Sequence, residues 1–200
     1  MSEAIVVRPL TPQRWDDLVE LLSASNGCDG CWCFNHHIDP GAPDVRGPAA
    51  LAAKHDVVRR GKAHGVIGYR DDAPIGWCAV DRRAEIPGHD CVRSRPTHAS
   101  AKSASDSPPT DDRTWVIHCF FVKPGQRGQG VARAMLCSVL DWLAREQAHR
   151  VEAFPTPPGR PACFHGYAGP YELYRAFGFQ QIESIDDNYC RVVLTLQPLA

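Results

Sequence analysis

The segment Arg127-Gly-Gln-Gly-Val-Ala132 has the composition of a phosphate-binding turn. It follows the apolar run Trp115–Val122, which predicts a buried strand, and it precedes a helical pattern of apolar residues. A turn between a strand and a helix presents free backbone N–H groups, and the helix dipole attracts anions there. The glycines let a ligand approach the backbone closely. The spacing is neither that of a P-loop nor that of a dinucleotide fingerprint, so we expect an anion site of another kind.

Two side chains near this turn have the chemistry of proton transfer. His118, within the predicted strand, titrates near neutrality and suits a general base, although a lone histidine in a sheet is often a hydrogen-bonded core residue. Glu152 on a neighbouring predicted strand and solvent are the alternative proton acceptors. The phenol of Tyr174 is a proton donor at neutral pH, so it suits a general acid; the alternative is half-buried packing.

The segment Cys28-Asp-Gly-Cys-Trp-Cys-Phe-Asn-His-His37 concentrates thiols and imidazoles. A Cys-x-x-Cys pair with nearby histidines is compatible with a zinc site, but no second pair lies at zinc-finger spacing. A thioredoxin-like redox pair normally opens a helix after a strand, and no strand is predicted before this segment. We expect no metal here, but a metal site, a redox pair and inert packing all stay open as alternatives on the residues alone.

These residues need a scaffold, and the chain predicts one of mixed type. Apolar patterns and turn residues predict strands and helices in the order β α α β β β α β α β. Such an order favours a mixed sheet with helices on both faces. We expect a single domain over residues 1–200, with residues 91–112 as an extended loop that is rich in Ser, Pro and Asp. The expected strands are 4–10, 64–69, 74–80, 115–122, 150–154 and 189–196, and the expected helices follow Thr11, span 49–61, follow the glycine-rich turn and span 170–177.

Composition narrows the partners and the compartment. The 200 residues carry a net charge of −1, which gives no basic field for nucleic acid or for a membrane surface. No apolar run has the length of a membrane span, and the first residues lack the pattern of a signal peptide. Nine cysteines without such a signal favour reduced thiols in the cytoplasm. We expect a monomer or a homodimer.

Three features resemble the GCN5-related N-acetyltransferase (GNAT) family. Arg127–Ala132 is similar to its Arg/Gln-x-x-Gly-x-Gly/Ala signature, and Tyr174 before Gly178-Phe179 is similar to its late Tyr-x-x-x-Gly-Phe helix. The order of elements also resembles that of the family. The resemblance implies an α/β (α+β) fold with a mixed, mostly antiparallel central sheet of about six to seven strands, flanked by helices on both faces.

The resemblance also implies the cofactor and the reaction. Acetyl-CoA would be the co-substrate, and its acetyl group would pass directly to an amine of a small molecule or peptide. Backbone amides of the glycine-rich turn would hold the pyrophosphate, and the end of the preceding strand would hold the pantetheine arm and the thioester carbonyl. The cofactor-binding residues would be Phe120, Phe121, Val122, Arg127, Gly128, Gln129, Gly130, Val131 and Ala132.

The resemblance assigns catalytic and acceptor residues as well. Tyr174 would be the acid that protonates the leaving thiolate. Val116 occupies the place where some members have a glutamate base, so His118 is our candidate base. Cys31-Trp-Cys-Phe34, with Gly76-Trp-Cys-Ala-Val80 and Cys119–Val122, resembles a bacterial subgroup that has a Cys-Trp-Cys segment. In that comparison Cys31, Trp32 and Cys33 would line the acceptor pocket. The alternative function is an acyl-CoA-binding sensory module that uses the segment Cys28–His37 for metal or redox sensing.

Overall fold

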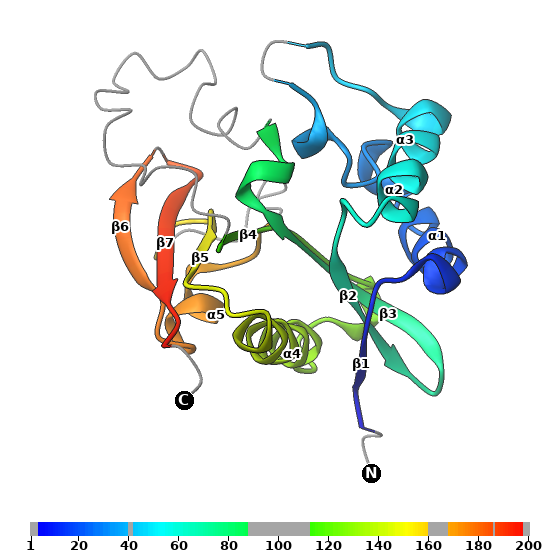
Figure 1. Cartoon of the computed structure of the whole chain (residues 1–200). Helices are drawn as coiled ribbons and strands as arrows, with labels where there is room; N and C mark the ends of the chain where they lie inside the picture. The colour runs from blue at the N-terminus through cyan, green and yellow to red at the C-terminus, as the bar shows by residue number, and fades with distance from the viewer. Residues whose placement is uncertain (1–3, 40–41, 88–112, 160–167, 186, 198–200) are drawn as a thin grey trace.

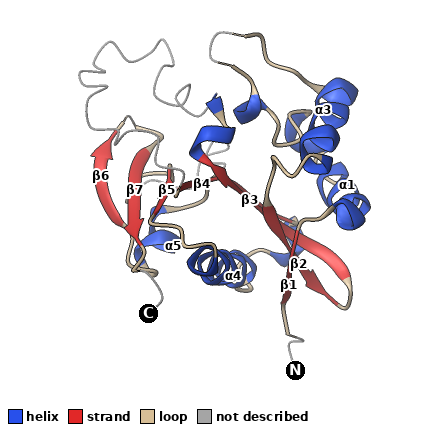
Figure 2. Ribbon diagram, in the orientation of Figure 1, coloured by secondary structure: helices blue, strands red, loops and turns tan. Residues whose placement is uncertain are grey.

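The fold is a seven-stranded sheet with helices on both faces (Figures 1 and 2). The computed structural model describes residues 4–39, 42–87, 113–159, 168–185 and 187–197. The strand order is β1-β2-β3-β4-β5-β7-β6, and all neighbours are antiparallel except β4 and β5. This confirms the predicted mixed, mostly antiparallel sheet. The strands are β1 (Val6–Pro9), β2 (Gly65–Arg70), β3 (Ala73–Arg82), β4 (Thr114–Val122), β5 (Arg150–Ala153), β6 (Gln180–Ser184) and β7 (Cys190–Thr195).

The helices differ greatly in length. The longest, α4, follows the glycine-rich turn, and among the described residues none of the helices has the length and apolar character needed to cross a membrane. Short 3-10 turns connect several elements: η1 (Pro12–Arg14), η2 (Asn35–His37), η3 (Arg83–Glu85) and η5 (Pro124–Gln126). The α-helices are α1 (Trp15–Ser23), α2 (Asn26–Asp29), α3 (Gly47–Arg59), α4 (Val131–Arg145) and α5 (Tyr171–Arg175).

Helix α4 packs against one face of the sheet. Its buried residues recur every three to four positions, which places them on one side of the helix. Burial of each such side chain stabilises the fold by about 1.5–3 kcal/mol. Gly76 of β3 permits the close approach, because a Cβ there would lie 2.8 Å from Val131 Cγ1. The buried residues of α4 are Val131, Met135, Leu136, Val139 and Leu143.

The other face is covered by α1 and by the segment that follows it. Leu18, Leu21 and Leu22 of α1 pack against residues of β2 and β3, among them Ile67 and Trp77. The expected helix after Thr11 is present, but its first turn is the 3-10 turn η1, and Thr11 makes no capping hydrogen bond through its side chain. The two faces of β4 therefore meet different helices, which decides where its side chains can act.

Strand β4 changes its neighbours along its length. Thr114–Ile117 pair with β5 on one side, whereas β3 accompanies β4 as far as Val122. Strand β5 ends at Ala153, so in the described part of the chain Cys119–Val122 have a paired strand only on the β3 side. Among the described residues, no strand pairs with the other edge of this segment, so it resembles an exposed strand edge that a ligand can meet.

A β-bulge interrupts β4 at His118. Cys119 pairs with Ala79 and Ile117 pairs with Val80, so His118 is an extra residue without a partner in β3. Consecutive residues of a regular strand point to opposite faces, but here His118 and Cys119 both contact the segment after α1. The bulge thus adds a histidine to that face.

Two local features show where the sequence pattern was and was not sufficient. The predicted hairpin forms at Asp71 and Asp72, whose φ angles of 52° and 58° are those of a type I′ turn. Strand β6 was not expected as a separate element, because most of its side chains are exposed and give no apolar alternation. The predicted loop 91–112 lies outside the described residues.

Candidate active site

The glycine-rich turn leads directly from β4 into α4. Gly128 and Gly130 have φ angles of 73° and 83°, which L-residues rarely adopt, and Gly130 is the N-cap of α4. No side chain caps this helix, and its first turn contains no acidic residue. The backbone N–H groups at the start of α4 and the positive end of its dipole therefore face an exposed turn, which is the arrangement that binds phosphate groups.

The side chains of the turn brace its backbone. Arg127 Nε donates to the carbonyl oxygen of Val122 at 3.1 Å, and Gln129 Nε2 donates to that of Gly125 at 2.9 Å. Arg70 of β2 donates to Gln129 Oε1 at 2.6 Å and also to Gln126 Oε1. These bonds use side-chain groups and leave the amides of Gly128 to Ala132 for a ligand. Sequence reasoning missed Arg70, which is 59 positions from Gln129.

Tyr174 lies on the α4 face of the sheet. Its side chain is fully buried, and its hydroxyl donates to the carbonyl oxygen of Ala168 at 2.6 Å. The ring lies 6.3 Å from that of Phe120, which belongs to the edge of β4 without a β5 partner. Burial raises the pKa of the phenol well above its usual value, so the hydroxyl carries its proton at neutral pH.

His118 lies on the opposite face and is held by a carboxylate. His118 Nε2 lies 2.8 Å from Asp81 Oδ2, and both side chains are buried. In the described part of the chain, His118 Nδ1 is a buried nitrogen without a hydrogen-bond partner. Burial lowers the pKa of His118, and the positive charge of Lys54 and the neighbouring His37 lower it further, whereas Asp81 raises it. The net shift is downward, which favours a neutral imidazole at neutral pH.

Asp81, on β3, is the centre of a cluster of histidines. His37 Nε2 lies 3.4 Å from Asp81 Oδ2, and His64 Nδ1 lies 3.1 Å from Asp81 Oδ1. The backbone N–H of His64 also donates to Asp81 Oδ1. Burial alone would raise the pKa of Asp81, but hydrogen bonds from His118 and His64, with the nearby imidazole of His37 and the charge of Lys54, hold it well below its usual value. Asp81 is therefore ionised across the working pH range of most enzymes.

The side chain of Lys54, on α3, also belongs to the cluster around Asp81. It is fully buried, and Nζ lies 3.3 Å from His37 Nε2. His37 Nδ1 lies 3.2 Å from the carbonyl oxygen of Glu85, which can only accept, so this nitrogen carries the proton. The ammonium of Lys54 can only donate, so Nε2 of a neutral His37 accepts from it. Both ring nitrogens of His37 are thus engaged.

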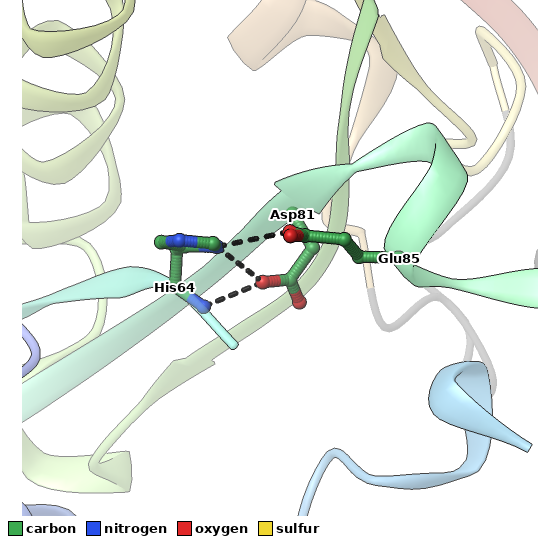
Figure 3. Close-up of side chains that lie close together, drawn as sticks. All are labelled: His64, Asp81 and Glu85. Carbon is green, nitrogen blue, oxygen red and sulfur yellow. Dashed lines mark hydrogen bonds and ion pairs between the residues drawn. The ribbon is translucent and has the colours of Figure 1, made fainter. Parts of the chain in front are cut away.

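His64, Asp81 and Glu85 have the donor types of a metal site. Figure 3 shows their side chains pointing toward one another. His64 Nδ1 lies 3.1 Å from Asp81 Oδ1 and 3.6 Å from Glu85 Oε2. The same geometry is that of an imidazole Nδ1–H group between two carboxylates. Lys62 also pairs with Glu85 Oε1 at 3.2 Å, which reduces the negative charge that would attract a cation. Hydrogen bonding by His64 and the pair between Lys62 and Glu85 account for these contacts without a metal ion.

The Cys-Trp-Cys segment lies against the bulge of β4. Cys33 Sγ contacts Cys119 Sγ, and the ring of His36 lies 4.5 Å from that of His118. Trp32 and Cys33 have φ angles of 49° and 48°, a strained conformation for such residues that recurs at functional sites. The structure therefore brings the predicted acceptor wall and the candidate base together. Their roles stay predictions.

The thiols of this segment differ in pKa. A hydrogen bond with Cys33 lowers the pKa of Cys31 to about 7, and the same neighbour lowers the pKa of Cys28. Cys33 itself is buried, and hydrogen bonds with Cys119, Cys28 and Cys31 raise its pKa. Seven cysteines belong to the described residues, and all of them are free thiols.

Glu152, the alternative base, is bound by three arginines. Its carboxylate is fully buried and pairs with Arg150 at 2.6 Å, with Arg191 at 2.7 Å and with Arg83 at 3.2 Å. Burial raises its pKa, but the arginines, chiefly Arg191, bring it below the ordinary value. A carboxylate stabilised in this way is a weak base. Val116 is buried against Ile86 and Phe154 and offers no proton acceptor.

Asp81, Lys54 and His64 were not recognised as site residues from the sequence. Asp81 directly follows the apolar run that predicted β3, and an acid at the end of such a run was the available signal. Only the packing of α3 and of the Cys-Trp-Cys segment on the sheet brings His37 and Lys54 to this carboxylate. Their convergence is not visible in any local pattern.

Comparison with known families agrees with this geometry. A family model described as "Acetyltransferase (GNAT) family" matches residues 32–179, which include β4, the glycine-rich turn and Tyr174. The chain belongs to the GNAT family. It is accordingly an N-acetyltransferase whose co-substrate is acetyl-CoA.

Solved structures of acetyltransferases share the fold at low identity. PaiA N-acetyltransferase from Thermoplasma acidophilum, in complex with coenzyme A, has a TM-score of 0.57 and 9% identity, over 96% of this chain and 99% of that one. Ribosomal-protein-alanine N-acetyltransferase from Brucella melitensis has a TM-score of 0.57 and 14% identity, over 96% and 99%. Aminoglycoside acetyltransferase AAC(6')-Ib, in complex with coenzyme A, has a TM-score of 0.56 and 14% identity, over 96% and 95%. A search of curated protein sequences gives no match.

Proposed function

We propose that this acetyltransferase moves the acetyl group of acetyl-CoA directly onto an amine of a small molecule or a peptide. The observation that carries the proposal is the continuity of β4 with its turn. The strand edge at Cys119–Val122 has no β5 partner, and it leads within a few residues to the uncapped start of α4. A pantetheine arm along Phe120, Phe121 and Val122 would therefore end with its pyrophosphate at the turn Arg127–Ala132, on the amides of Gly128 to Ala132.

In this arrangement the two candidate proton carriers flank β4 from opposite faces. The amine nitrogen bonds to the thioester carbonyl carbon, and its proton passes to His118 Nδ1. The carbon–sulfur bond then breaks as the hydroxyl of Tyr174 protonates the thiolate. Solvent takes the proton from His118 and returns one to Tyr174. Fixed amides of β4 would stabilise the oxyanion without reorganisation, and orientation of the two substrates would supply much of the acceleration.

The acceptor wall is proposed from the place of Cys31, Trp32 and Cys33. This segment contacts the bulge next to His118, so an amine bound against it would be adjacent to the candidate base. The proteins with similar folds act on different amines: one is named for the alanine of a ribosomal protein, and one is solved with ribostamycin and coenzyme A. Both chemical classes belong in the test panel.

The test is acetylation itself, followed by mass spectrometry. Purified protein is incubated with acetyl-CoA and with a panel of amines: aminoglycosides, polyamines and peptides with an N-terminal alanine. We expect an acetylated product whose formation needs both substrates, together with saturable acetyl-CoA binding in calorimetry. Failure to bind acetyl-CoA, or binding without transfer to any amine class, would contradict the proposal; the second result would favour an acyl-CoA sensor.

A further inference from the structure

The unpartnered nitrogen of His118 requires an explanation. Buried polar atoms are nearly always hydrogen-bonded, and a catalytic role is one of the explanations for an exception in a native protein. Among the described histidines, His118 Nδ1 is the buried nitrogen without a partner. The other ring nitrogen, Nε2, has a carboxylate at 2.8 Å. An ionised carboxylate only accepts hydrogen bonds, so Nε2 must carry the proton, and a neutral His118 keeps its lone pair on Nδ1.

The surroundings of Asp81 keep it in the role of acceptor. Its carboxylate accepts hydrogen bonds from the rings of His118 and His64 and from the backbone N–H of His64. The ring of His37 lies next to the oxygen that accepts from His118. A carboxylate that accepts from three N–H groups is stabilised in its ionised form. It therefore does not take the proton of His118, which stays on Nε2.

The charged and titratable groups around His118 come from several elements. Asp81 is on β3, His36 and His37 are in η2, and Lys54 is on α3. None of them donates to Nδ1, because in the described part of the chain that nitrogen has no partner. The bulge of β4 adds His118 to this face beside Cys119. The ring is thus fixed at one nitrogen and open at the other.

We propose that Asp81 is the positioning residue of this enzyme: it holds the proton of His118 on Nε2 and so makes Nδ1 the atom that accepts the proton of the amine. The inference rests on the proposed function, in which His118 is the base. Asp81 does not touch the substrate and acts only through the imidazole. Asp81 and His118 have the roles of a carboxylate–histidine pair, in which the carboxylate fixes the tautomer of the imidazole and stays ionised.

The first experiment reads the tautomer in the wild-type protein by nitrogen–proton correlation NMR of the histidine rings at about pH 7.5, where a histidine of ordinary pKa is neutral. His118→Gln identifies the signals. We expect the Nε2–H form for His118, and an Nδ1–H form would overturn the proposal. This measurement needs no turnover and no substitution at Asp81. Absence of acetyl transfer by the wild type, which contradicts the proposed function, is therefore distinguishable from a failure of this inference.

The second experiment is a double-mutant cycle. Asp81→Asn keeps the shape, but its amide group can donate to Nε2, which moves the proton to Nδ1 and removes the base. We expect kcat to fall by about 100-fold or more, while the KM for acetyl-CoA changes by less than about 3-fold. In the His118→Gln background, Asp81→Asn should change kcat by less than about 3-fold, because Asp81 acts only through the imidazole ring that this background lacks.

The matched control is Asp72→Asn, on the exposed hairpin turn where Asp72 pairs with Arg8. We expect it to leave kcat unchanged. Circular dichroism and the acetyl-CoA dissociation constant establish that each variant is folded. A folded Asp81→Asn enzyme with wild-type kcat, or effects of the two substitutions that simply multiply, would overturn the proposal.

Discussion

Cys33 Sγ and Cys119 Sγ lie 3.2 Å apart, although 86 positions separate the two residues in the chain. One belongs to the Cys-Trp-Cys segment and the other to β4, directly after the bulge at His118. Their contact holds the segment over the part of the sheet where, in the proposed function, the amine and the thioester meet. The segment's thiols can therefore serve as probes of the proposed acceptor wall.

Cys31 should be the most reactive of these thiols. Its neighbour Cys33 lowers its pKa to about 7, and Cys31 is partly exposed. We expect iodoacetamide to modify Cys31 in the native protein with a rate that rises through about pH 7, because the thiolate is the nucleophile. Peptide mass mapping follows the reaction. Cys190, which is buried and whose pKa is raised to about 11 by burial, is the internal control. Equal rates at the two cysteines would contradict the prediction.

Gly130→Ala should weaken coenzyme binding. Gly130 has a φ of 83° at the start of α4, and an added methyl would meet no protein atom within 4 Å, so it would occupy the space expected for the pyrophosphate. The left-handed backbone also costs an alanine about 1–2 kcal/mol. We expect the dissociation constant of acetyl-CoA in calorimetry to rise at least about 10-fold, which corresponds to 1.4 kcal/mol.

Gly125→Ala is the matched control for this substitution. It lies in the same exposed turn with open space around it, but without a positive φ. It should change coenzyme affinity by less than about 2-fold, since neither backbone strain nor the helix start is involved. A similar loss in both variants would mean that the turn does not bind the pyrophosphate at α4.

The turn and most of the elements were predictable because their signals are local. Glycines at fixed spacing after an apolar strand, and apolar residues at helical spacing, are read within a window of about 18 residues. The cluster around Asp81 was not predictable, because its members Asp81, His37, His118 and Lys54 each belong to a different element. The bulge at His118 was likewise invisible, since it exists only in the register between β3 and β4. Exposed strand β6 lacks the alternation that marks a half-buried strand.

Tyr174→Phe should lower kcat without a comparable loss of coenzyme affinity. The phenol is the proposed donor to the thiolate, and removal of a general acid typically costs about 100-fold or more in rate. The lost bond to Ala168 leaves a buried carbonyl without its donor, at about 1–3 kcal/mol of unfolding free energy. Steady-state kinetics and thermal unfolding separate the two effects.

Tyr171→Phe on the same short helix α5 is the control for Tyr174→Phe. Tyr171 is only partly buried, and its ring packs at the edge of the core. This substitution should leave kcat within about 2-fold of the wild type. A folded Tyr174→Phe enzyme with the same kcat as Tyr171→Phe would exclude Tyr174 as the acid.

His118 should make the stability of the fold depend on pH. Its pKa in the folded protein is lowered, chiefly by burial, so below about pH 6.5 the unfolded chain binds a proton that the folded chain resists. This contribution is complete above that pH and is lost as the pH falls. Urea unfolding at about pH 7.5 and 5.5 should show a smaller loss for His118→Gln than for the wild type. An equal loss in the two proteins would contradict the assigned direction of the shift.

Glu152→Gln should destabilise the fold while leaving the chemistry intact. Arg191 is 3% exposed, and without its carboxylate partner this buried guanidinium would cost about 3–5 kcal/mol of unfolding free energy. Urea unfolding measures this loss, and Glu172→Gln, which breaks the exposed pair with Arg175, should change stability little. At a temperature where Glu152→Gln is folded, kcat should stay within about 3-fold of the wild type. Three arginines stabilise the ionised carboxylate, so Glu152 is too weak a base to take the proton of the amine. A loss of about 100-fold in the folded variant would instead restore Glu152 as the base and displace His118 from that role.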